Sequence, residues 1–452
     1  MSAIAKVLLA AGHDISGSDR NFDMGKNLAL CADFQKKGVG IFPQDGSGVD
    51  NSIDIFVVSS AIEDSIPDVI KAKEEGLTIK TRAQVLADIL SSYNGIAIGG
   101  TSGKTTVTAM TGHILNVAGL SPTVINGGIM LNEGSNVILG SGGFGVIEAD
   151  ESDGSIEFYR PSVAVVNNIT LDHKPLAELR KLFKDFVSTA SVGAVLNADC
   201  PEAFNLKGYN SNVLTFSLTG KEDADIKAAN ICLIEGGSSF TIDDTRFELK
   251  VIGKHNIANA LAAIGVADML GIPREVSAKA LYSYKGVHRR LETVGTGNDI
   301  TVIDDFAHNP AKIEASLSAL KESLGRLWVI YQPHGFAPTR LMKEGLINAF
   351  ASYLDKNDIL LFSEIFYAGG SVSRDISSAD IAGPLLEKGL NAQVVPSRAD
   401  MLGMIMAKAR AGDRIVVMGA RDDTLSDFAR LILQAVESPN KGKDTGNETM
   451  ED

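Results

Sequence analysis

The sequence predicts an α/β protein of three domains with parallel sheets. Strand-like apolar runs alternate with helical stretches nearly throughout the chain, which is the pattern of βαβ units. The chain has 452 residues, whereas a compact domain has about 150. We therefore place boundaries near residues 93 and 293, which gives N-terminal, central and C-terminal domains over 1–93, 94–292 and 293–437. A polar, aperiodic tail follows at 438–452, and we predict that it is disordered.

The clearest strands and helices follow in chain order. In the N-terminal domain a buried strand is predicted at 54–60, followed by helices in DSIPDVIKAKEEG and AQVLADILSSY. The central domain has strands at 95–100, in GVIEADES and in VAVVNNI, and a helix in GKHNIANALAAIGVADMLG. In the C-terminal domain five short apolar strands are each followed by helix-like sequence: DITVIDDFAHNP, RLWVIYQPHG, DILLFSEI, AQVVPS and DRIVVMGA.

Composition excludes several classes of protein. No window approaches 18 consecutive apolar residues, and the N-terminus lacks the basic region and cleavage site of a secretory signal, so we predict no membrane span and no signal peptide. The cysteines Cys31, Cys200 and Cys232 fit neither a disulfide framework nor a CxxC metal site, which favours a reducing, cytoplasmic location. The net charge of −14, without a Lys/Arg run, disfavours a nucleic-acid partner. A small anionic ligand stays compatible, because local loops bind phosphates.

The strongest local signal is a glycine-rich loop between a strand and a helix, in IAIGGTSGKTTVTAM. Glycines allow successive backbone N–H groups to face one centre, and the helix N-terminus adds positive potential there. Lys104 is placed to neutralise β- and γ-phosphate charge, and the Thr105 hydroxyl can ligate Mg²⁺. The strict P-loop pattern has a glycine five residues before Gly103, where this chain has Ile98. Strand, GKTT and helix together favour a nucleoside triphosphate site over a structural turn.

Acidic residues follow a later strand, in EADESD (148–153), and Asp172-His173 follows another. Ligands of parallel α/β sheets bind beyond the carboxyl ends of the strands. Carboxylates and a histidine at two such ends could share divalent cations with the phosphates. EADESD alone fits a solvated acidic loop, but its position after the strand and phosphate loop favours the metal-binding interpretation.

These motifs, with others in the same order along nearly the whole chain, resemble the Mur ligases of peptidoglycan synthesis. Those enzymes couple ATP hydrolysis to the joining of a carboxylate and an amine. The resemblance rests on SGSD (16–19), VVSSAI (57–62), GTSGKTT (100–106), EADESD (148–153), NNITLDH (167–173), GKHNIANALAA (253–263), GVHRRLE (286–292), DDFAHNP (304–310), YQPHGFAPTR (331–340) and MGARDD (418–423). It implies an N-terminal Rossmann-like domain for a UDP-sugar, a central ATP-binding domain and a C-terminal Rossmann-like domain for the amine acceptor.

The resemblance implies ATP and Mg²⁺ as cofactors and assigns residues to them. The loop residues that would bind the nucleotide phosphates are Gly100, Thr101, Ser102, Gly103, Lys104, Thr105 and Thr106. The metal ligands would be Thr105, Glu148 and His173. An adenine-binding helix would carry His255, Asn256 and Asn259. The C-terminal contacts to the γ-phosphate and ribose would be Arg290 and Asp305.

The remaining assignments concern catalysis and the substrates. The resemblance implies a catalytic set of Lys104, Glu148, His173, Arg290, His308 and His334, the two last facing the substrates. Substrate binding is assigned to Ser18, Asp19, Ser59, Ser60 and Arg340.

Plain structural alternatives exist for several of these residues. GKHNIANALAA fits a packed amphipathic helix, although two asparagines on one face are costly in a core without a ligand. Arg289 and Arg290 fit an ordinary solvated pair. His308 alone fits a structural histidine.

The sequence departs from the family pattern at two places. The family opens with a strand and a glycine-rich loop, whereas MSAIAKVLLAAG reads as the helix that follows that loop. We therefore expect an N-terminal domain without its first strand, and interpret the chain as truncated or its start site as assigned too far downstream. In the alanine-adding members, extra arginines occur where this chain has Gly335 and Pro338, while Arg340 is retained. His173 is followed by Lys174-Pro175, where an acidic residue is common in the family.

The implied activity is an ATP-dependent ligation of L-alanine to UDP-N-acetylmuramate through an acyl phosphate. Alternatives within the family are a ligase that adds a whole tripeptide or another amine, and a catalytically impaired homologue. A P-loop switch or kinase is a different class, and the acidic cluster together with RRLE and DDFAH argues against it. A binding protein descended from a ligase is a third class. The oligomeric state is left open by the sequence.

Overall fold

A computed structural model describes the chain except for residues 60–61, 153, 171–174, 235, 368–372 and 439–452. It separates into two compact units, which are described in turn. The first unit comprises Met1–Ile231, Phe240–Glu248 and Ile257–Lys285, and the second comprises Cys232–Ser239, Leu249–Asn256 and Gly286–Asp452. The tail predicted at 438–452 lies almost wholly outside the described residues. None of the described helices is long and apolar enough to cross a membrane.

The N-terminal part of the first unit contains two separate pairs of parallel strands. β1 (Ser16–Gly17) pairs with β2 (Gly40–Ile41), and β3 (Ile55–Val58) pairs with β4 (Thr78–Thr81). Among the described residues no strand joins the two pairs into one sheet, and the expected loss of a first strand stays a prediction. The helices of this part are α1 (Ser2–Ala10), α2 (Arg20–Asp23), α3 (Leu28–Lys36), α4 (Pro67–Glu74) and α5 (Arg82–Ser91).

An eight-stranded sheet forms the centre of the first unit, in the order β12-β11-β10-β9-β5-β8-β6-β7. β7 is antiparallel to β6, and the other neighbours whose pairing is described are parallel. The strands are β5 (Asn94–Gly99), β6 (Thr123–Met130), β7 (Ser135–Ile138), β8 (Phe144–Glu148), β9 (Val163–Val166), β10 (Gly193–Asn197), β11 (Val213–Ser217) and β12 (Ile226–Lys227). The helices with them are α6 (Lys104–Val117), α7 (Leu176–Ser188), α8 (Pro201–Phe204), α9 (Lys254–Met269) and α10 (Arg274–Ser283), with short 3₁₀ turns at Ser155–Glu157 and Asn205–Tyr209.

β5 lies in the interior of this sheet, which explains its continuous apolar run. Ile96, Ala97 and Ile98 are fully buried, as expected for a strand that is covered by helices on both faces. Its neighbours β8 and β9 run parallel to it. The loop after β5 therefore emerges beside Glu148 at the end of β8 and beside Asn167, which follows β9.

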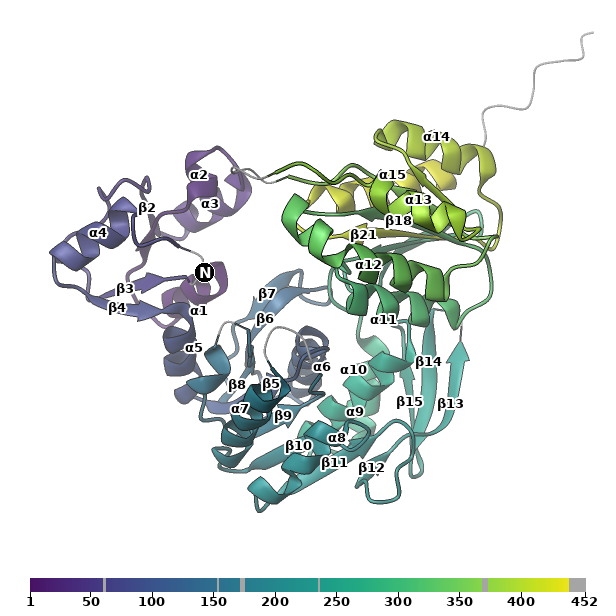
Figure 1. The fold of residues 1–452 in the computed structure, drawn as a ribbon. Helices are drawn as coiled ribbons and strands as arrows, with labels where there is room; N and C mark the ends of the chain where they lie inside the picture. The colour runs from purple at the N-terminus through teal and green to yellow at the C-terminus, as the bar shows by residue number, and fades with distance from the viewer. Residues whose placement is uncertain (60–61, 153, 171–174, 235, 368–372, 439–452) are drawn as a thin grey trace, which may run out of the picture. The chain divides into compact units, whose positions relative to one another are not determined.

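A small sheet was not anticipated from the sequence. β13 (Ala229–Ile234), β14 (Gly237–Ile242) and β15 (Thr245–Leu249) form three neighbouring strands (Figure 1). The rings of Phe240 and Phe247 stack with 5.2 Å between their centroids. The apolar residues of 229–249 occur in short groups separated by glycine and polar residues, so the hydrophobic pattern on which strand prediction depends is weak.

The second unit contains a doubly wound six-stranded sheet. Its order is β16-β17-β21-β18-β19-β20, with β16 antiparallel and the others parallel. The strands are β16 (Glu292–Gly297), β17 (Ile300–Asp305), β18 (Leu327–Gln332), β19 (Ile359–Phe362), β20 (Asn391–Val394) and β21 (Arg414–Gly419), and five of them were predicted. The helices are α11 (Pro310–Lys321), α12 (Phe336–Tyr353), α13 (Ala379–Glu387), α14 (Arg398–Lys408) and α15 (Thr424–Glu437).

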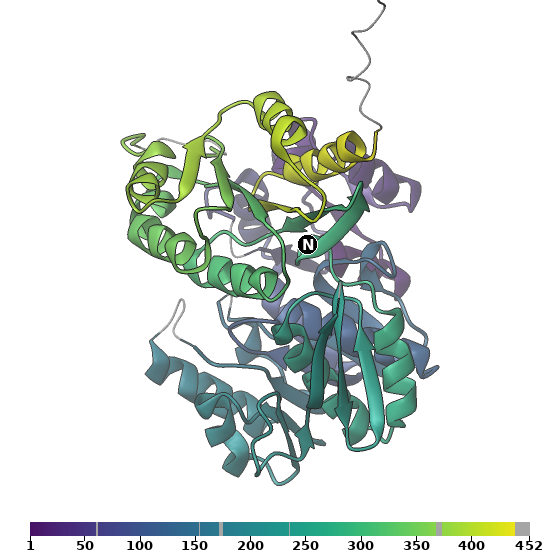
Figure 2. The ribbon, with the colours of Figure 1, turned by 90° about the vertical axis from the view of Figure 1, so that its right-hand side faces the viewer.

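Alternate residues of β18 supply two separate hydrophobic cores. Leu327, Val329 and Tyr331 pack with α11, α12 and α13, whereas Trp328 and Ile330 pack with α14 and α15. This is the alternation of side chains across a strand. Figure 2 shows the helices of 310–353 in green and those of 398–437 in yellow on opposite sides of the strands.

Asp413, directly before β21, connects several residues around the core that contains Trp328. Its carboxylate accepts hydrogen bonds from the Trp328 indole at 3.0 Å, from two guanidinium nitrogens of Arg326 at 2.6 and 3.1 Å, and from the Arg410 amide at 2.9 Å. Burial acts to raise the pKa of Asp413, but these hydrogen bonds and the Arg326 charge outweigh it and hold the pKa below its usual value.

We expect Asp413→Asn to lower the free energy of unfolding of this unit by about 3 kcal/mol, because it leaves the Arg326 guanidinium without its ionic partner. Urea unfolding followed by the fluorescence of Trp328, the only tryptophan, measures the change. The wild type loses this stabilisation as the pH falls through the lowered pKa of Asp413, and the variant has no such acid-dependent loss. Asp427→Asn is the control, since its pair with Arg430 is exposed. Equal unfolding midpoints for Asp413→Asn and Asp427→Asn would contradict this account.

Candidate active site

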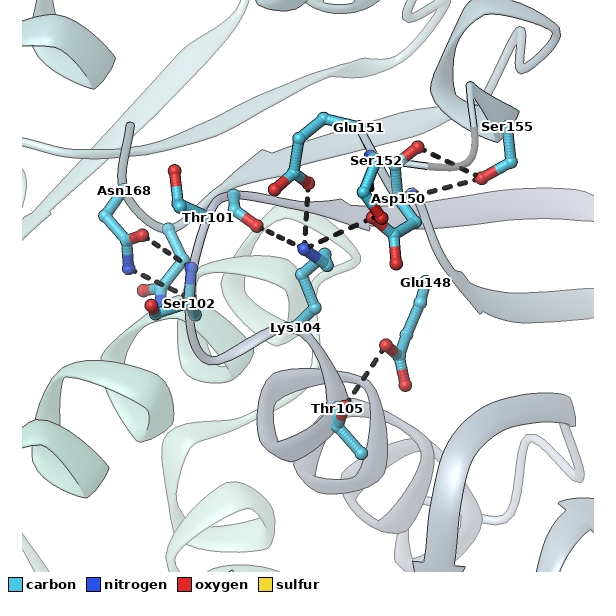
Figure 3. A network of polar contacts seen from close by, with 12 residues as sticks. Thr101, Ser102, Lys104, Thr105, Glu148, Asp150, Glu151, Ser152, Ser155 and Asn168 are labelled. Atoms are coloured by element: carbon cyan, nitrogen blue, oxygen red, sulfur yellow. Dashed lines mark hydrogen bonds and ion pairs between the residues drawn. The ribbon is translucent and has the colours of Figure 1, made fainter. Parts of the chain in front are cut away.

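The loop between β5 and α6 is shaped by two glycines and held by two asparagines. Gly100 and Gly103 have φ of +131° and +89°. Glycine adopts these positive φ values more readily than any residue with a side chain. A Cβ on Gly103 would lie 2.3 Å from the Asn167 amide nitrogen and 2.5 Å from the Asn259 amide oxygen. The side chain of Asn168 accepts from the Ser102 N–H at 2.8 Å and donates to the Ser102 carbonyl at 2.9 Å (Figure 3). The loop is therefore fixed before any ligand binds.

Lys104 begins α6 and lies among oxygen atoms of the loop and of the acidic cluster. Its ammonium is 2.8 Å from the Gly100 carbonyl, 2.8 Å from the Glu151 carboxylate and 3.7 Å from the Asp150 carboxylate (Figure 3). Burial acts to raise the pKa of Asp150, but the Lys104 charge and hydrogen bonds from Ser152 outweigh it and lower that pKa. The solvated-loop interpretation of the acidic cluster is wrong for Glu151, which is buried.

Thr105 and Glu148 form an all-oxygen pair suited to Mg²⁺. The Thr105 hydroxyl donates to one Glu148 carboxylate oxygen at 3.1 Å, and the Gly127 N–H donates to the other at 2.6 Å. Hydroxyl and carboxylate oxygens are the ligands that Mg²⁺ prefers, so these residues fit the predicted metal. His173, the third predicted ligand, lies outside the described residues.

The predicted adenine-binding residues lie at the start of α9. Asn259 is buried, and its amide oxygen accepts from the Asn167 amide at 3.0 Å, next to the phosphate loop. Asn256 is also buried and donates to the Ile252 carbonyl at 2.8 Å. His255 is exposed. Both asparagines thus have hydrogen-bond partners within the protein. Adenine binding by His255, Asn256 and Asn259 stays a prediction.

In the second unit, Arg289, Arg290 and Asp305 meet around Phe306. Arg289 is buried, is 3.3 Å from Asp304 and donates to the Gly419 carbonyl at 2.7 Å, so the alternative of a solvated pair is wrong for it. Both guanidinium carbons lie 5.2 Å from the centre of the Phe306 ring. Asp305 is buried; it accepts from the Ser316 hydroxyl and from the Leu291 N–H at 3.2 Å. Burial raises the pKa of Asp305. The phosphate and ribose contacts of Arg290 and Asp305 stay predictions.

His308 and His334 are brought together, although 26 positions of sequence separate them. Their ring centroids are 5.2 Å apart with the rings edge to face. Burial lowers the pKa of His308 to about 4, and its Nδ1 is 2.8 Å from the Phe306 carbonyl. Burial also lowers the pKa of His334, and the nearby Arg421 charge lowers it further. Both rings are therefore largely neutral at pH 7.

The predicted substrate-binding residues are engaged with other side chains. Ser18 donates to the buried Asp68, and the Asp19 carboxylate caps α2 by accepting from the Asn21 N–H at 2.8 Å. Arg340 is ion-paired with Asp375. Ser59 is half-buried after β3, and Ser60 lies outside the described residues.

Asn167 and Asn168 were not assigned a role from the sequence, although the NNITLDH motif contains them. The signal was available, since two adjacent asparagines directly after a buried strand need partners in the fold. The Asn167 amide donates to the Ser102 carbonyl at 3.0 Å. The two asparagines reach the phosphate loop because β9 pairs with β5. No local sequence pattern reveals that pairing.

Comparisons with known proteins decide the family. Models of the Mur ligase family match the chain in three segments: the catalytic domain at 1–94, the middle domain at 98–267 and the glutamate ligase domain at 289–421. The UDP-N-acetylmuramate–L-alanine ligase of Anaeromyxobacter dehalogenans (strain 2CP-C) is 36% identical over 449 residues, which is 96% of this chain and 95% of the relative. The chain belongs to the Mur ligase family.

Solved structures agree with this. The UDP-N-acetylmuramate–alanine ligase of Thermotoga maritima has a TM-score of 0.78 to this Mur ligase at 26% identity, with 96% of each chain covered. A murein peptide ligase from Psychrobacter arcticus has a TM-score of 0.66 at 26% identity, with 97% of each covered. The predicted three-domain Mur ligase fold is confirmed, and the protein is an ATP-dependent, amide-forming ligase.

We expect Gly103→Ala to abolish binding of a non-hydrolysable ATP analogue, because the new Cβ displaces the amides of Asn167 and Asn259 that brace the loop. Isothermal titration calorimetry measures the loss, and circular dichroism confirms the fold. The matched control is Gly119→Ala, since Gly119 has φ +78° but nothing within 4 Å of its Cβ position. It should bind the analogue as the wild type does, at a cost of about 1 kcal/mol in stability. Unimpaired binding by Gly103→Ala would refute the assigned loop geometry.

Proposed function

We propose that this Mur ligase joins L-alanine to the lactyl carboxylate of UDP-N-acetylmuramate, with ATP converted to ADP. The observation that carries the proposal is the 36% identity to a UDP-N-acetylmuramate–L-alanine ligase over nearly the full chain, combined with an intact phosphate loop. ATP and a nucleotide sugar are cytoplasmic substrates, so we infer a cytoplasmic location.

The chemistry explains why such a ligase needs a phosphate loop. A carboxylate is a poor acyl donor, because its leaving group would be oxide. Transfer of the γ-phosphoryl group to the carboxylate gives an acyl phosphate, and the amine attacks this through a tetrahedral intermediate that expels phosphate. The protein mainly positions the reactants and compensates their charge.

In the first unit, different residues bind the phosphates and the metal ion. Lys104 contacts the β- and γ-phosphates, and the backbone N–H groups of the braced loop bind the phosphate oxygens. Thr105 and Glu148 would hold Mg²⁺, and His173 is proposed as a further ligand. Bound Mg²⁺ supplies compensation for the negative charge of the phosphates.

In the second unit, a neutral histidine serves the amine step. The amine must be held with its lone pair towards the acyl phosphate, and His308 is half-buried and neutral at pH 7 because its pKa is about 4. A neutral imidazole can accept a hydrogen bond from the amine and so orient it. We assign the Phe306 region, with Arg290 and Asp305, to nucleotide contact, and Ser18, Asp19 and Ser59 to the UDP-sugar.

A second acceptor is favoured by one specific observation. The family resemblance implies arginines in the alanine-adding members where this chain has Gly335 and Pro338, and Arg340 is already paired with Asp375. A peptide or another amine on the same sugar nucleotide is therefore the alternative, and a murein peptide ligase has a similar structure.

Steady-state ADP release tests the proposed function. The assay uses ATP, Mg²⁺, UDP-N-acetylmuramate and a panel of amino acids together with the L-Ala-γ-D-Glu-diaminopimelate tripeptide. Turnover that needs both UDP-N-acetylmuramate and L-alanine supports the proposal. Turnover with the tripeptide alone favours the alternative, and ADP release without an amine refutes both.

We expect Lys104→Met to reduce kcat at least 1000-fold, the order of effect reported for groups that compensate transferring phosphoryl charge. Because the change leaves Glu151 buried without its cation, the double variant Lys104→Met/Glu151→Gln is measured as well and should be equally inactive. Lys184→Met is the control. Lys184, on α7, lies over the Tyr209 ring, and the variant should keep full activity. A kcat within tenfold of wild type for the double variant would remove Lys104 from the mechanism.

A further inference from the structure

His334 has different neighbours on its two sides at the carboxyl edge of the second unit's sheet. On one side, β18 pairs in parallel with β21, and the register ends with Gln332 opposite Gly419. Both strands end there, so Arg421 and His334 each leave the sheet two residues beyond this pair, at the same edge. On the other side, His334 forms a bridge with Phe366. Ligands of such sheets bind beyond these strand ends.

Arg421 has a backbone conformation that an arginine adopts at a cost. Its φ is +70°, in the left-handed region where glycine is favoured and a side chain introduces strain. Strain of this kind persists where the surrounding structure imposes it, and it concentrates at ligand-binding sites. The loop after β21 thus keeps a large cationic side chain where glycine would fit better.

The guanidinium of Arg421 is available to a ligand. Among the residues that the structure describes, no hydrogen bond or ion pair to this side chain is found, and the side chain is exposed. Its acidic neighbour Asp422 is 2.7 Å from Arg398 and also accepts from Thr424. The Arg421 charge acts on His334, whose pKa it helps to lower.

Other arginines near this edge are already engaged. Arg289 is bound to Asp304 and to the Gly419 carbonyl, and Arg340 is bound to Asp375. Arg374 lies 4.7 Å from the centre of the Tyr367 ring and 5.7 Å from that of Phe336, on the Phe366 side of His334. Gly335 and Pro338 supply no charge.

We propose that Arg421 binds the carboxylate of the amine acceptor, and so determines that the acceptor is a free amino acid or a peptide with an acidic group near the amine. This rests on the proposed ligase function. A guanidinium forms two parallel hydrogen bonds to a carboxylate, and a site beside the neutral His334 holds the acceptor next to the histidine pair. Arg340 is then a positioning residue that holds the 373–375 segment against α12.

The test uses Arg421→Gly, because glycine adopts φ +70° without strain, so this variant should be at least as stable as the wild type. We expect its KM for L-alanine, or for whichever acceptor the panel identifies, to rise about 10- to 100-fold. The KM values for ATP and UDP-N-acetylmuramate should stay within twofold. The wild type should prefer L-alanine to L-alaninamide, which lacks the carboxylate, and the variant should lose this preference. Arg374→Gln is the matched control and should keep it.

A second readout does not need turnover. Phenylglyoxal modifies accessible arginines, and peptide mass spectrometry measures the labelling of Arg421 and Arg374 separately. L-alanine, but not L-alaninamide, should slow the labelling of Arg421 in the full-length protein with ATP analogue and UDP-N-acetylmuramate present. An Arg421→Gly enzyme that still discriminates between acid and amide, or labelling that no panel carboxylate slows, overturns the inference. Absent turnover with protected Arg421 would instead refute the ligase proposal and keep the carboxylate site.

Discussion

The braced phosphate loop is the constraint on which the rest of the first unit depends. The Asn168 side chain holds both backbone groups of Ser102, and the Asn167 amide holds the Ser102 carbonyl and Asn259. These bonds connect β5, β9 and α9, so the loop keeps its shape only while the central sheet keeps its strand order. Preorganisation of this kind is effective because no free energy is then spent on ordering the loop when phosphate binds.

In the second unit, too, polar side chains hold one another in place. Its strand ends present arginines, histidines and buried aspartates, and most of their polar groups are satisfied by one another. Arg289 spans Asp304 and the end of β21, while Asp305 holds the Leu291 N–H. The side chains that stay exposed at this edge, notably Arg421, therefore indicate the chemistry of the ligand better than the number of charged residues in the sequence does.

Much of the fold could be predicted from the sequence, because strands such as β5, β18 and β21 are continuous apolar runs followed by helices. Lys104, Thr105 and Glu148 were also predicted, since strand ends of one sheet meet at one edge, and the structure brings the three together. The bracing role of Asn167 and the placement of Arg421 beside His334 were not, because both depend on which strands are neighbours and on their register. The small β13–β15 sheet was missed because its apolar residues occur in short groups separated by glycine and polar residues.

The acidic partners of Lys104 have a consequence for how nucleotide is admitted. The ammonium is already surrounded by the oxygens of Glu151, Asp150 and Gly100, so an arriving triphosphate meets a compensated ion and has to exchange places with carboxylates. We therefore expect the loop to favour ligands with several linked phosphates over a single inorganic phosphate, which offers less charge and fewer contacts in exchange for the carboxylates.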